Sequence, residues 1–168
     1  ATLPAIFAGL LLKDYFLKIF DNVHLVGLAL CSTGFLLIFS KRFKNNQEAI
    51  TFSSSILVGI AQAVAIIPGI SRSGLTISMC MYLGITPKEA ARFSFLLSIP
   101  VILGASILGF LELESNNTFN YMTLTVAIIT SFLTGVLALK ILLKILETGR
   151  FYFFGFYCLI VGVSTIFI

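Results

Sequence analysis

A single charged residue, Arg72, stands in the long apolar stretch between Glu48 and Lys88. A lone guanidinium inside a membrane costs roughly 2.5 to more than 10 kcal/mol, and such a residue is by default a functional-site hypothesis. Arginine keeps its proton at any working pH, so it cannot lower this cost by becoming neutral. No carboxylate lies in the same stretch. An anion must therefore compensate Arg72, and a ligand phosphate fits because a guanidinium matches phosphate oxygens two at a time.

The composition is that of a membrane protein. Of the 168 residues, 58% are apolar and 11% are charged, and the mean hydropathy is +1.07. Ordinary soluble domains carry about 25% charged residues. The net charge of +4 does not indicate a nucleic-acid partner, because the basic residues are scattered and form no basic face with interleaved aromatics. The three cysteines, Cys31, Cys80 and Cys158, lie in apolar runs without a C-x-x-C spacing, which favours packing over a disulfide or a reactive role.

Hydropathy divides the chain into apolar segments that short polar segments separate. A helix that crosses a membrane needs about 20 residues. The predicted helices lie at residues 1–12, 23–40, 50–67, 75–85, 88–111, 121–143 and 151–168, and the first is too short to cross alone. The run Thr86-Pro87-Lys88-Glu89 is typical of a helix N-terminus, with Pro87 as the first helical residue. This pattern predicts an all-α polytopic membrane protein with a single transmembrane domain over residues 1–168.

The distribution of lysine and arginine predicts an orientation in the membrane. Basic residues gather in loop 41–49, in turn 86–92 and in the stretch 140–150. The charged residues of loop 112–120 are all acidic. Cytoplasmic loops carry the excess of lysine and arginine. We therefore expect the first three to face the cytoplasm and loop 112–120 to face outward. The segment 50–86 must then leave the cytoplasmic side and return to it.

The segment 50–86 is predicted to be a re-entrant, broken helix hairpin. Its return arm, residues 75–85, rises only about 16 Å at 1.5 Å per residue. That is roughly half of the hydrocarbon thickness, so we expect the turn at 68–76 to lie within the membrane. Non-helical backbone at that depth survives only where protein buries it or where it lines a wet cavity. Broken helices of this kind form the binding sites of transporters, with helix N-termini facing an anionic group.

The residues of the turn favour an anion. Pro68 is expected to end the first arm, and the second arm is expected to start near Gly74, with its free N–H groups pointing into the turn. Gly69 and Gly74 permit close approach of the backbone to a ligand. Hydroxyl donors stand at Ser71, Ser73 and Thr76, beside the charge of Arg72. A plainer interpretation is a kinked turn whose hydroxyls satisfy backbone carbonyls. Gln62, in the first arm, either faces the pocket or makes an interhelical hydrogen bond.

The run Pro68-Gly69-Ile70-Ser71-Arg72-Ser73-Gly74-Leu75-Thr76 resembles the PGxSRSxxT signature of the undecaprenyl-diphosphate phosphatases, also called bacitracin-resistance proteins. The flanks, GIAQA at 59–63 and AARFSFLLSIP at 90–100, are similar to that family too. The strong resemblance covers about residues 52–106. The rest of the chain matches the family as hydrophobic spans in a plausible order.

The resemblance implies a multi-pass enzyme of the bacterial inner membrane that hydrolyses undecaprenyl diphosphate to undecaprenyl phosphate and phosphate. The reaction takes place on the outer side and recycles the lipid carrier for cell-wall synthesis. The resemblance also implies an inverted-repeat architecture of which this chain holds the second half. Carried over residue by residue, the catalytic residues are Ser71, Arg72 and Thr76, and the substrate-binding residues are Gly69, Ser73 and Gly74, to which the position of Gln62 adds a further candidate.

The chain departs from the family at the N-terminal acidic motif, two glutamates followed by a proline, a Ser-Ser pair and a histidine, which it lacks. The one histidine, His24, follows Asp21-Asn22 at the start of an apolar span and is predicted to be interfacial rather than catalytic. Phosphate-ester hydrolysis needs a nucleophile or activated water and usually a cation. We therefore expect the chain to correspond to the C-terminal two thirds of a family member and to be inactive alone. Any divalent cation is expected to have its ligands outside it.

Two functional classes stay open at this point. One is the lipid-diphosphate phosphatase, and the other is a membrane transporter or lipid-carrier translocator with an anion-binding broken helix. A hydrolase needs the upstream acidic motif, whereas a transporter does not. The expected partners are a polyprenyl diphosphate lipid and membrane lipid, and no nucleic acid. Gly155 and Gly162, seven residues apart, indicate either a helix contact or the seam of a homodimer.

Overall fold

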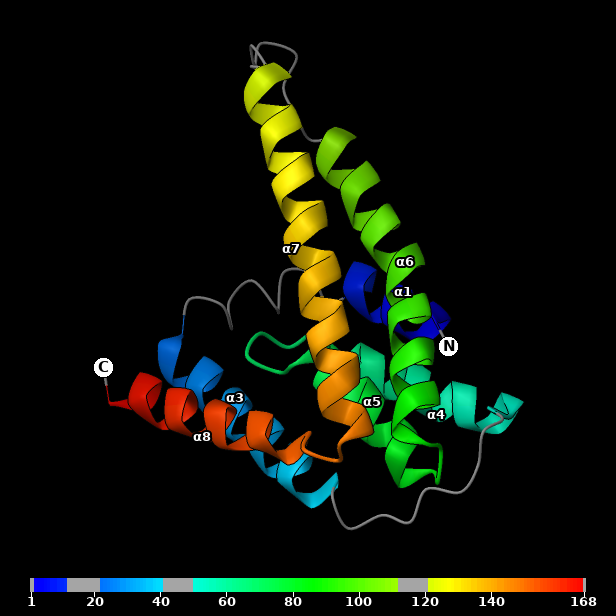
Figure 1. Ribbon diagram of the computed structural model, residues 1–168, viewed down its shortest axis with the longest axis vertical. Coiled ribbons are helices and arrows are strands. Elements are labelled where there is room, and N and C mark those ends of the chain that lie inside the picture. Colours follow the sequence, from blue (N-terminus) through cyan, green and yellow to red (C-terminus); the bar gives the residue numbers. More distant parts are fainter. Residues whose placement is uncertain (1, 12–21, 41–49, 112–120, 168) are drawn as a thin grey trace.

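The structure is a computed structural model that describes residues 2–11, 22–40, 50–111 and 121–167 (Figure 1). The regular elements in these ranges are α-helices. They are α1 (Thr2–Leu11), α3 (Val23–Phe39), α4 (Phe52–Val64), α5 (Arg72–Tyr82), α6 (Pro87–Leu111), α7 (Tyr121–Glu147) and α8 (Tyr152–Ile166). Two of them, α6 and α7, are long and apolar enough to cross a membrane. The prediction of an all-α polytopic membrane protein is confirmed.

The helix boundaries follow the sequence signals closely, except around the turn. Helix α6 begins at Pro87, as predicted, and the carbonyl of Thr86 accepts the first helical hydrogen bond, from Ala90 N at 2.9 Å. The first arm of the predicted hairpin was expected to reach residue 67, but α4 ends at Val64. A proline disfavours helical angles in the residue directly before it, which here is Ile67. The helix ends earlier than this rule alone requires, at Val64.

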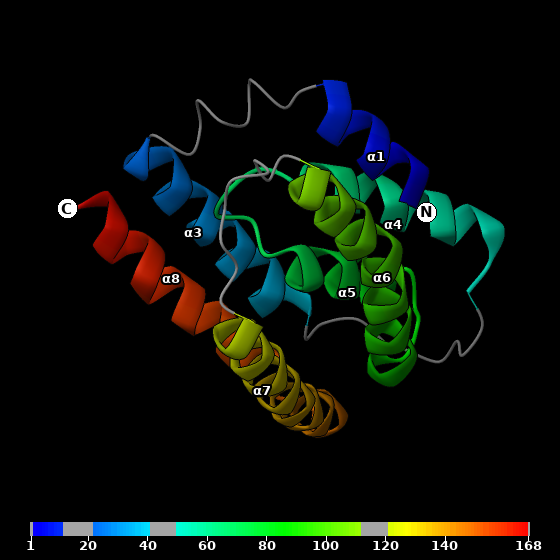
Figure 2. The ribbon, with the colours of Figure 1, turned by 90° about the horizontal axis from the view of Figure 1, so that it is seen from above.

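Helices α3 and α8 lie side by side and antiparallel (Figure 2). Glycines on both helices make the contact. A Cβ added at Gly34 would lie 2.8 Å from the carbonyl oxygen of Gly155, and one at Gly162 would lie 2.9 Å from that of Gly27. Only glycine allows two helix backbones to approach so closely. The predicted helix contact of Gly155 and Gly162 is therefore made within the chain, where α3 covers them.

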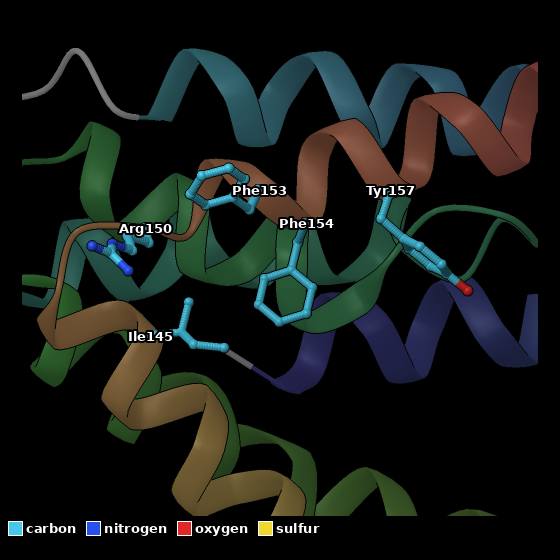
Figure 3. Close-up of a pocket in the computed structure, with 5 residues that line it drawn as sticks. All are labelled: Ile145, Arg150, Phe153, Phe154 and Tyr157. Carbon is cyan, nitrogen blue, oxygen red and sulfur yellow. The ribbon is translucent and has the colours of Figure 1, made fainter.

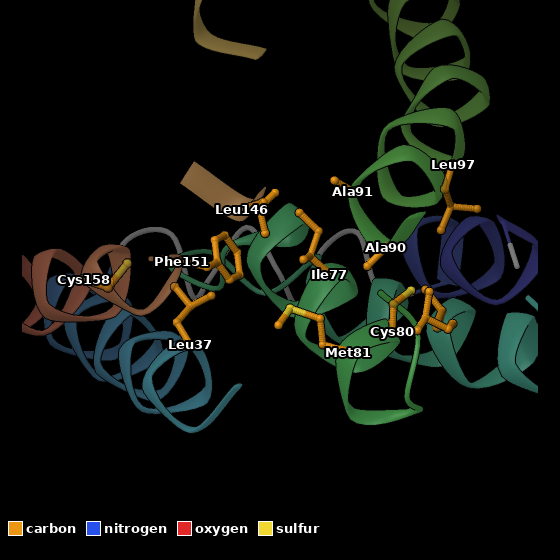
Figure 4. Close-up of a cluster of buried hydrophobic side chains, with 12 residues drawn as sticks. Leu37, Ile77, Cys80, Met81, Ala90, Ala91, Leu97, Leu146, Phe151 and Cys158 are labelled. Atoms are coloured by element: carbon orange, nitrogen blue, oxygen red, sulfur yellow. The ribbon is translucent and has the colours of Figure 1, made fainter. Parts of the chain in front are cut away.

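The hydrophobic core surrounds α5, the helix that begins at Arg72 (Figure 4). Ile77 and Cys80 of α5 are fully buried, as are Ala90 and Ala91 of α6. Met81 of α5 and Ile85, between α5 and α6, also belong to this core. Its other members come from α3, α4 and α6 and from the α7–α8 region: Leu37, Val58, Leu97, Leu146, Phe151 and Cys158. The burial of Cys80 and Cys158 as free thiols confirms their packing role. Because four segments enclose α5, the position of its N-terminus is set by the core.

Two of the predicted cytoplasmic segments meet in the structure. The Nζ atom of Lys88, at the start of α6, lies 3.6 Å from the Oε1 atom of Glu147, at the end of α7. The turn 86–92 and the end of the stretch 140–150 therefore share one side of the molecule, as the positive-inside pattern requires. Loops 41–49 and 112–120 lie outside the described residues, so the orientation itself stays a prediction.

Candidate functional site

The turn between α4 and α5 presses against α3. Gly69 has a φ of 91°, in the left-handed region that glycine enters without strain. A Cβ at this position would lie 2.5 Å from the carbonyl oxygen of Val26 and 2.9 Å from the Cβ of Ala29. The turn can approach α3 this closely only because residue 69 has no side chain. Figure 2 shows the turn, the green loop before α5, reaching toward α3.

Ser71 is the N-cap of α5. Its backbone is extended, with φ −69° and ψ 112°, and its Oγ accepts a hydrogen bond from Gly74 N at 3.1 Å. Its own N–H donates to the hydroxyl of Thr33 on α3 at 3.2 Å. The expectation that α5 starts near Gly74 is wrong by two residues, because serine is a strong N-cap and ends the turn earlier. Arg72 and Ser73 are therefore the first helical residues, whose N–H groups have no partner within a helix.

The guanidinium of Arg72 is held by two neutral acceptors. Its Nη2 donates to Oε1 of Gln62 at 3.0 Å and to the carbonyl oxygen of Leu97 at 3.2 Å. The two acceptors belong to α4 and α6, so the side chain joins three helices. Within the described residues no carboxylate pairs with Arg72, and the ion pairs there are Lys88–Glu147 and Arg92–Glu89. The positive charge of Arg72 is thus fixed in place but not cancelled.

Gln62 is almost fully buried, with 2% of its surface exposed. Its hydrogen bond to Arg72 links α4 to α5, which confirms the interhelical alternative of the sequence analysis. Its Nε2 atom is buried and has no hydrogen-bond partner among the described residues. The predicted role of Gln62 in substrate binding stays a prediction, and the structure places its amide oxygen against the Arg72 guanidinium.

Thr76 points toward α6 and is 1% exposed. Its hydroxyl lies 2.9 Å from the carbonyl oxygen of Arg72 and 2.6 Å from the Oγ of Ser94. In this arrangement the Thr76 hydroxyl stabilises the first helical turn of α5 on the side that packs against α6. A catalytic role for Thr76 stays a prediction.

Ser73 and Gly74 lie in the first turn of α5. Ser73 is half-buried, and its carbonyl oxygen lies 3.3 Å from the Thr76 hydroxyl. A Cβ at Gly74 would lie 2.9 Å from the Oγ of Ser71, so a side chain there would press on the N-cap. The structure therefore gathers Ser71, Arg72, Ser73 and Gly74 at one helix N-terminus, as the motif predicts.

Two supporting residues were not predicted from the sequence, Thr33 and Ser94. Thr33 is 1% exposed and Ser94 is 5% exposed, and each bonds to a residue of the turn or of α5. Ser94 belongs to the flank that resembles the family, which is a signal that could have found it. For Thr33 the sequence carries no signal, because only the fold brings α3 to the turn.

His24 lies at the start of α3 and bonds to the end of α8. Its Nδ1 donates to the carbonyl oxygen of Ile166 at 3.0 Å, which requires the tautomer with a proton on Nδ1. This contact ties α3 to α8 at an exposed position. That His24 is interfacial rather than catalytic stays a prediction.

A cavity of about 460 Å³ lies elsewhere, between the end of α7 and the start of α8 (Figure 3). It is lined by Ile145, Arg150, Phe153, Phe154 and Tyr157, none of which belongs to the turn. We therefore assign the candidate site by charge and hydrogen bonding at the α5 N-terminus. The described residues contain no group of three histidine, cysteine or acidic side chains that could hold a metal ion, so they do not by themselves fit a metal site.

Comparison with known proteins gives one family. The model of the family described as "Bacitracin resistance protein BacA" matches residues 1–164. Similar proteins named undecaprenyl-diphosphatase come from Korarchaeum cryptofilum, 40% identical over 163 residues, and from Desulforapulum autotrophicum, 41% identical over 169 residues. One from Bacillus cereus, named undecaprenyl-diphosphatase 1, is 40% identical over 170 residues.

These matches cover nearly all of this chain but not all of its relatives. They include 97%, 98% and 99% of the chain, against 62%, 61% and 63% of the three proteins in the same order. The chain thus spans less than two thirds of the length of the relatives that it matches.

Proposed function

The chain belongs to the bacitracin resistance protein BacA family, and on this premise we propose that it forms the phosphate-binding part of an undecaprenyl-diphosphatase. The reaction is the hydrolysis of undecaprenyl diphosphate to undecaprenyl phosphate and phosphate. It breaks the bond between the terminal phosphorus and the bridging oxygen, and a water oxygen takes the place of the bridging oxygen. The substrate is a polyprenyl diphosphate whose apolar chain lies in the membrane.

The observation that carries this proposal is the arginine at the N-terminus of α5. Arg72 is half-buried, has only the neutral acceptors Gln62 and Leu97 among the described residues, and stands at the positive end of a helix dipole. Helix N-termini with free N–H groups are ready-made anion sites. A diphosphate is an anion that can use both the charge of the guanidinium and the N–H groups.

Each residue of the turn has a role that its contacts allow. The Ser71 Oγ accepts the capping bond from Gly74 N, so its own proton is available to a phosphate oxygen. The N–H groups of Arg72 and Ser73 lie at the open end of α5. Fixed donors of this kind stabilise the negative charge that grows on phosphate oxygens during the reaction. Thr76 contributes indirectly, because its hydroxyl lies against the Arg72 carbonyl oxygen.

The alternative function, a transporter or lipid-carrier translocator, is not favoured. The relatives from three different organisms carry the name of a diphosphatase. A broken helix that binds an anion is compatible with either class. The names of these relatives therefore favour the hydrolase.

The proposed location is the bacterial plasma membrane, with several crossings and with the site toward the outer side. The apolar helices α6 and α7 support a membrane location. Lys88 at the start of α6 and Lys144 in the last turn of α7 support a cytoplasmic position for that side. The turn lies at the opposite end of α5 from Tyr82, where the chain leads into α6.

Phosphate release from undecaprenyl diphosphate tests the proposal. The purified 168-residue chain is compared with the same chain co-expressed with the N-terminal part of a family member that carries the acidic motif. We expect no turnover by the chain alone and hydrolysis by the assembled halves. Turnover by the chain alone at the rate of a full-length relative would place the whole reaction on the turn. Absence of hydrolysis by correctly assembled halves would contradict the proposed function.

A further inference from the structure

The way in which Arg72 is held suggests a specific task for Gln62. Charged groups that a protein encloses are normally paired with an opposite charge, which cancels theirs. Arg72 instead donates to an amide oxygen and a backbone carbonyl oxygen, at 3.0 Å and 3.2 Å. Both acceptors are neutral, so they set the direction of the guanidinium and leave its positive charge unpaired.

The orientation of the Gln62 amide follows from chemistry. A guanidinium has donors and no acceptor, so the atom of Gln62 that faces it must be the oxygen. The Nε2 donor then faces away from Arg72 and is buried without a partner in the described part of the chain. A buried donor without a partner is unfavourable. Gln62 therefore occupies a position that packing and hydrogen bonding alone do not favour.

We propose that Gln62 is the positioning residue of the phosphate site: it aims the Arg72 guanidinium without neutralising it. This inference rests on the function proposed above. Of the five N–H groups of an arginine, the two on Nη2 face Gln62 and Leu97, which leaves those on Nη1 and Nε for the ligand. A glutamate at position 62 would hold the guanidinium equally well but would cancel the charge that a phosphate needs.

That difference separates positioning from a purely structural role. Gln62→Glu keeps an oxygen acceptor for Arg72, whereas Gln62→Met keeps the size of the side chain and loses the acceptor. If the hydrogen bond served only to hold α4 against α5, Gln62→Glu would behave like the wild type. If Gln62 positions an uncancelled charge, both variants lose affinity for phosphate groups, and Gln62→Glu loses at least as much as Gln62→Met.

The test measures binding of inorganic pyrophosphate to the purified chain by calorimetry, together with the unfolding temperature without ligand. We expect each variant to weaken binding by about tenfold or more. Gln62→Met loses one hydrogen bond to a charged group, and Gln62→Glu keeps an acceptor but cancels the charge that the ligand uses. Ser78→Ala is the matched control, since Ser78 Oγ is also buried without a partner among the described residues. It is expected to bind pyrophosphate like the wild type. If Gln62→Met does not fold, Gln62→Glu decides the outcome.

Wild-type affinity in Gln62→Glu would overturn the proposal. In the assembled enzyme the same variants are expected to raise KM for the polyprenyl diphosphate and to lower kcat, because a misdirected or neutralised guanidinium serves neither binding nor the transition state. A wild-type enzyme that binds pyrophosphate in a Gln62-dependent way but hydrolyses no polyprenyl diphosphate would contradict the proposed function and leave the role of Gln62 in place.

Discussion

The hydroxyl oxygen of Thr76 lies 2.6 Å from the hydroxyl oxygen of Ser94, in the buried contact between α5 and α6. Thr76 also lies 2.9 Å from the Arg72 carbonyl oxygen. The threonine of the motif therefore connects the first turn of α5 to the helix that packs against it. Through this connection, α6 helps to fix the helix end that carries Arg72.

Thr76→Val is expected to destabilise the chain. Valine keeps the shape of threonine but leaves the Ser94 hydroxyl buried without this partner, at a cost of about 1–3 kcal/mol. The free energy of unfolding in detergent, measured by denaturant titration, checks this. The double variant Thr76→Val with Ser94→Ala removes both hydroxyls and is expected to recover part of the loss. Losses that simply add in the double variant would show that the two hydroxyls do not interact.

Gly69→Ala is expected to disrupt the turn. A side chain at φ 91° is strained by about 1–3 kcal/mol, and its Cβ would also lie 2.5 Å from the Val26 carbonyl oxygen. Gly104→Ala is the control, because nothing lies within 4 Å of a Cβ added there, inside α6. Alanine in a helix is favoured over glycine by about 1 kcal/mol, so this variant is expected to be neutral or stabilising. Equal unfolding temperatures for the two variants would contradict the positive φ and the close contact of Gly69 with α3.

Arg72→Lys is expected to remove most of the activity of the assembled enzyme while the protein still inserts. Lysine carries the charge but not the planar group that can reach Gln62, Leu97 and a phosphate at once. Loss of one charged hydrogen bond corresponds to about 1.5–3 kcal/mol, a decrease of about tenfold or more in kcat/KM. Arg92→Lys is the control, because Arg92 is exposed and pairs with Glu89 at 3.0 Å. Near-wild-type hydrolysis by Arg72→Lys would make Arg72 a structural residue.

Cysteine labelling in intact cells tests the predicted orientation. In a background without Cys31, Cys80 and Cys158, the variant Asn116→Cys is expected to react with a membrane-impermeant reagent, and Lys44→Cys is expected to stay unlabelled. Both positions lie outside the described residues, and the expectation rests on the lysine and arginine pattern. Labelling at position 44 but not at 116 would reverse the orientation.

The amino-acid sequence by itself determined the class of the protein and the centre of the site. Long apolar segments with polar breaks predict membrane helices, because hydropathy reports directly on the solvent that surrounds a helix. The start of α6 at Pro87 followed from local capping chemistry. Arg72 was identified because a lone charge in an apolar stretch is energetically costly and therefore indicates a functional site. These features depend on neighbours in the sequence or on single residues, which a sequence shows.

Only the tertiary structure decided which groups surround that site. The contacts of Thr33 with Ser71 and of Leu97 with Arg72 join residues 38 and 25 positions apart, and no local pattern predicts such pairs. The start of α5 also depended on which of two local preferences prevailed. Capping by the Ser71 side chain set the first residue of the helix, and the conformational freedom of Gly74 did not. Thr76 and Gln62 have side chains that could serve a ligand or a neighbouring helix. Packing of α4, α5 and α6 decided the outcome, because it places the Thr76 hydroxyl against Ser94 and the Gln62 amide oxygen against Arg72.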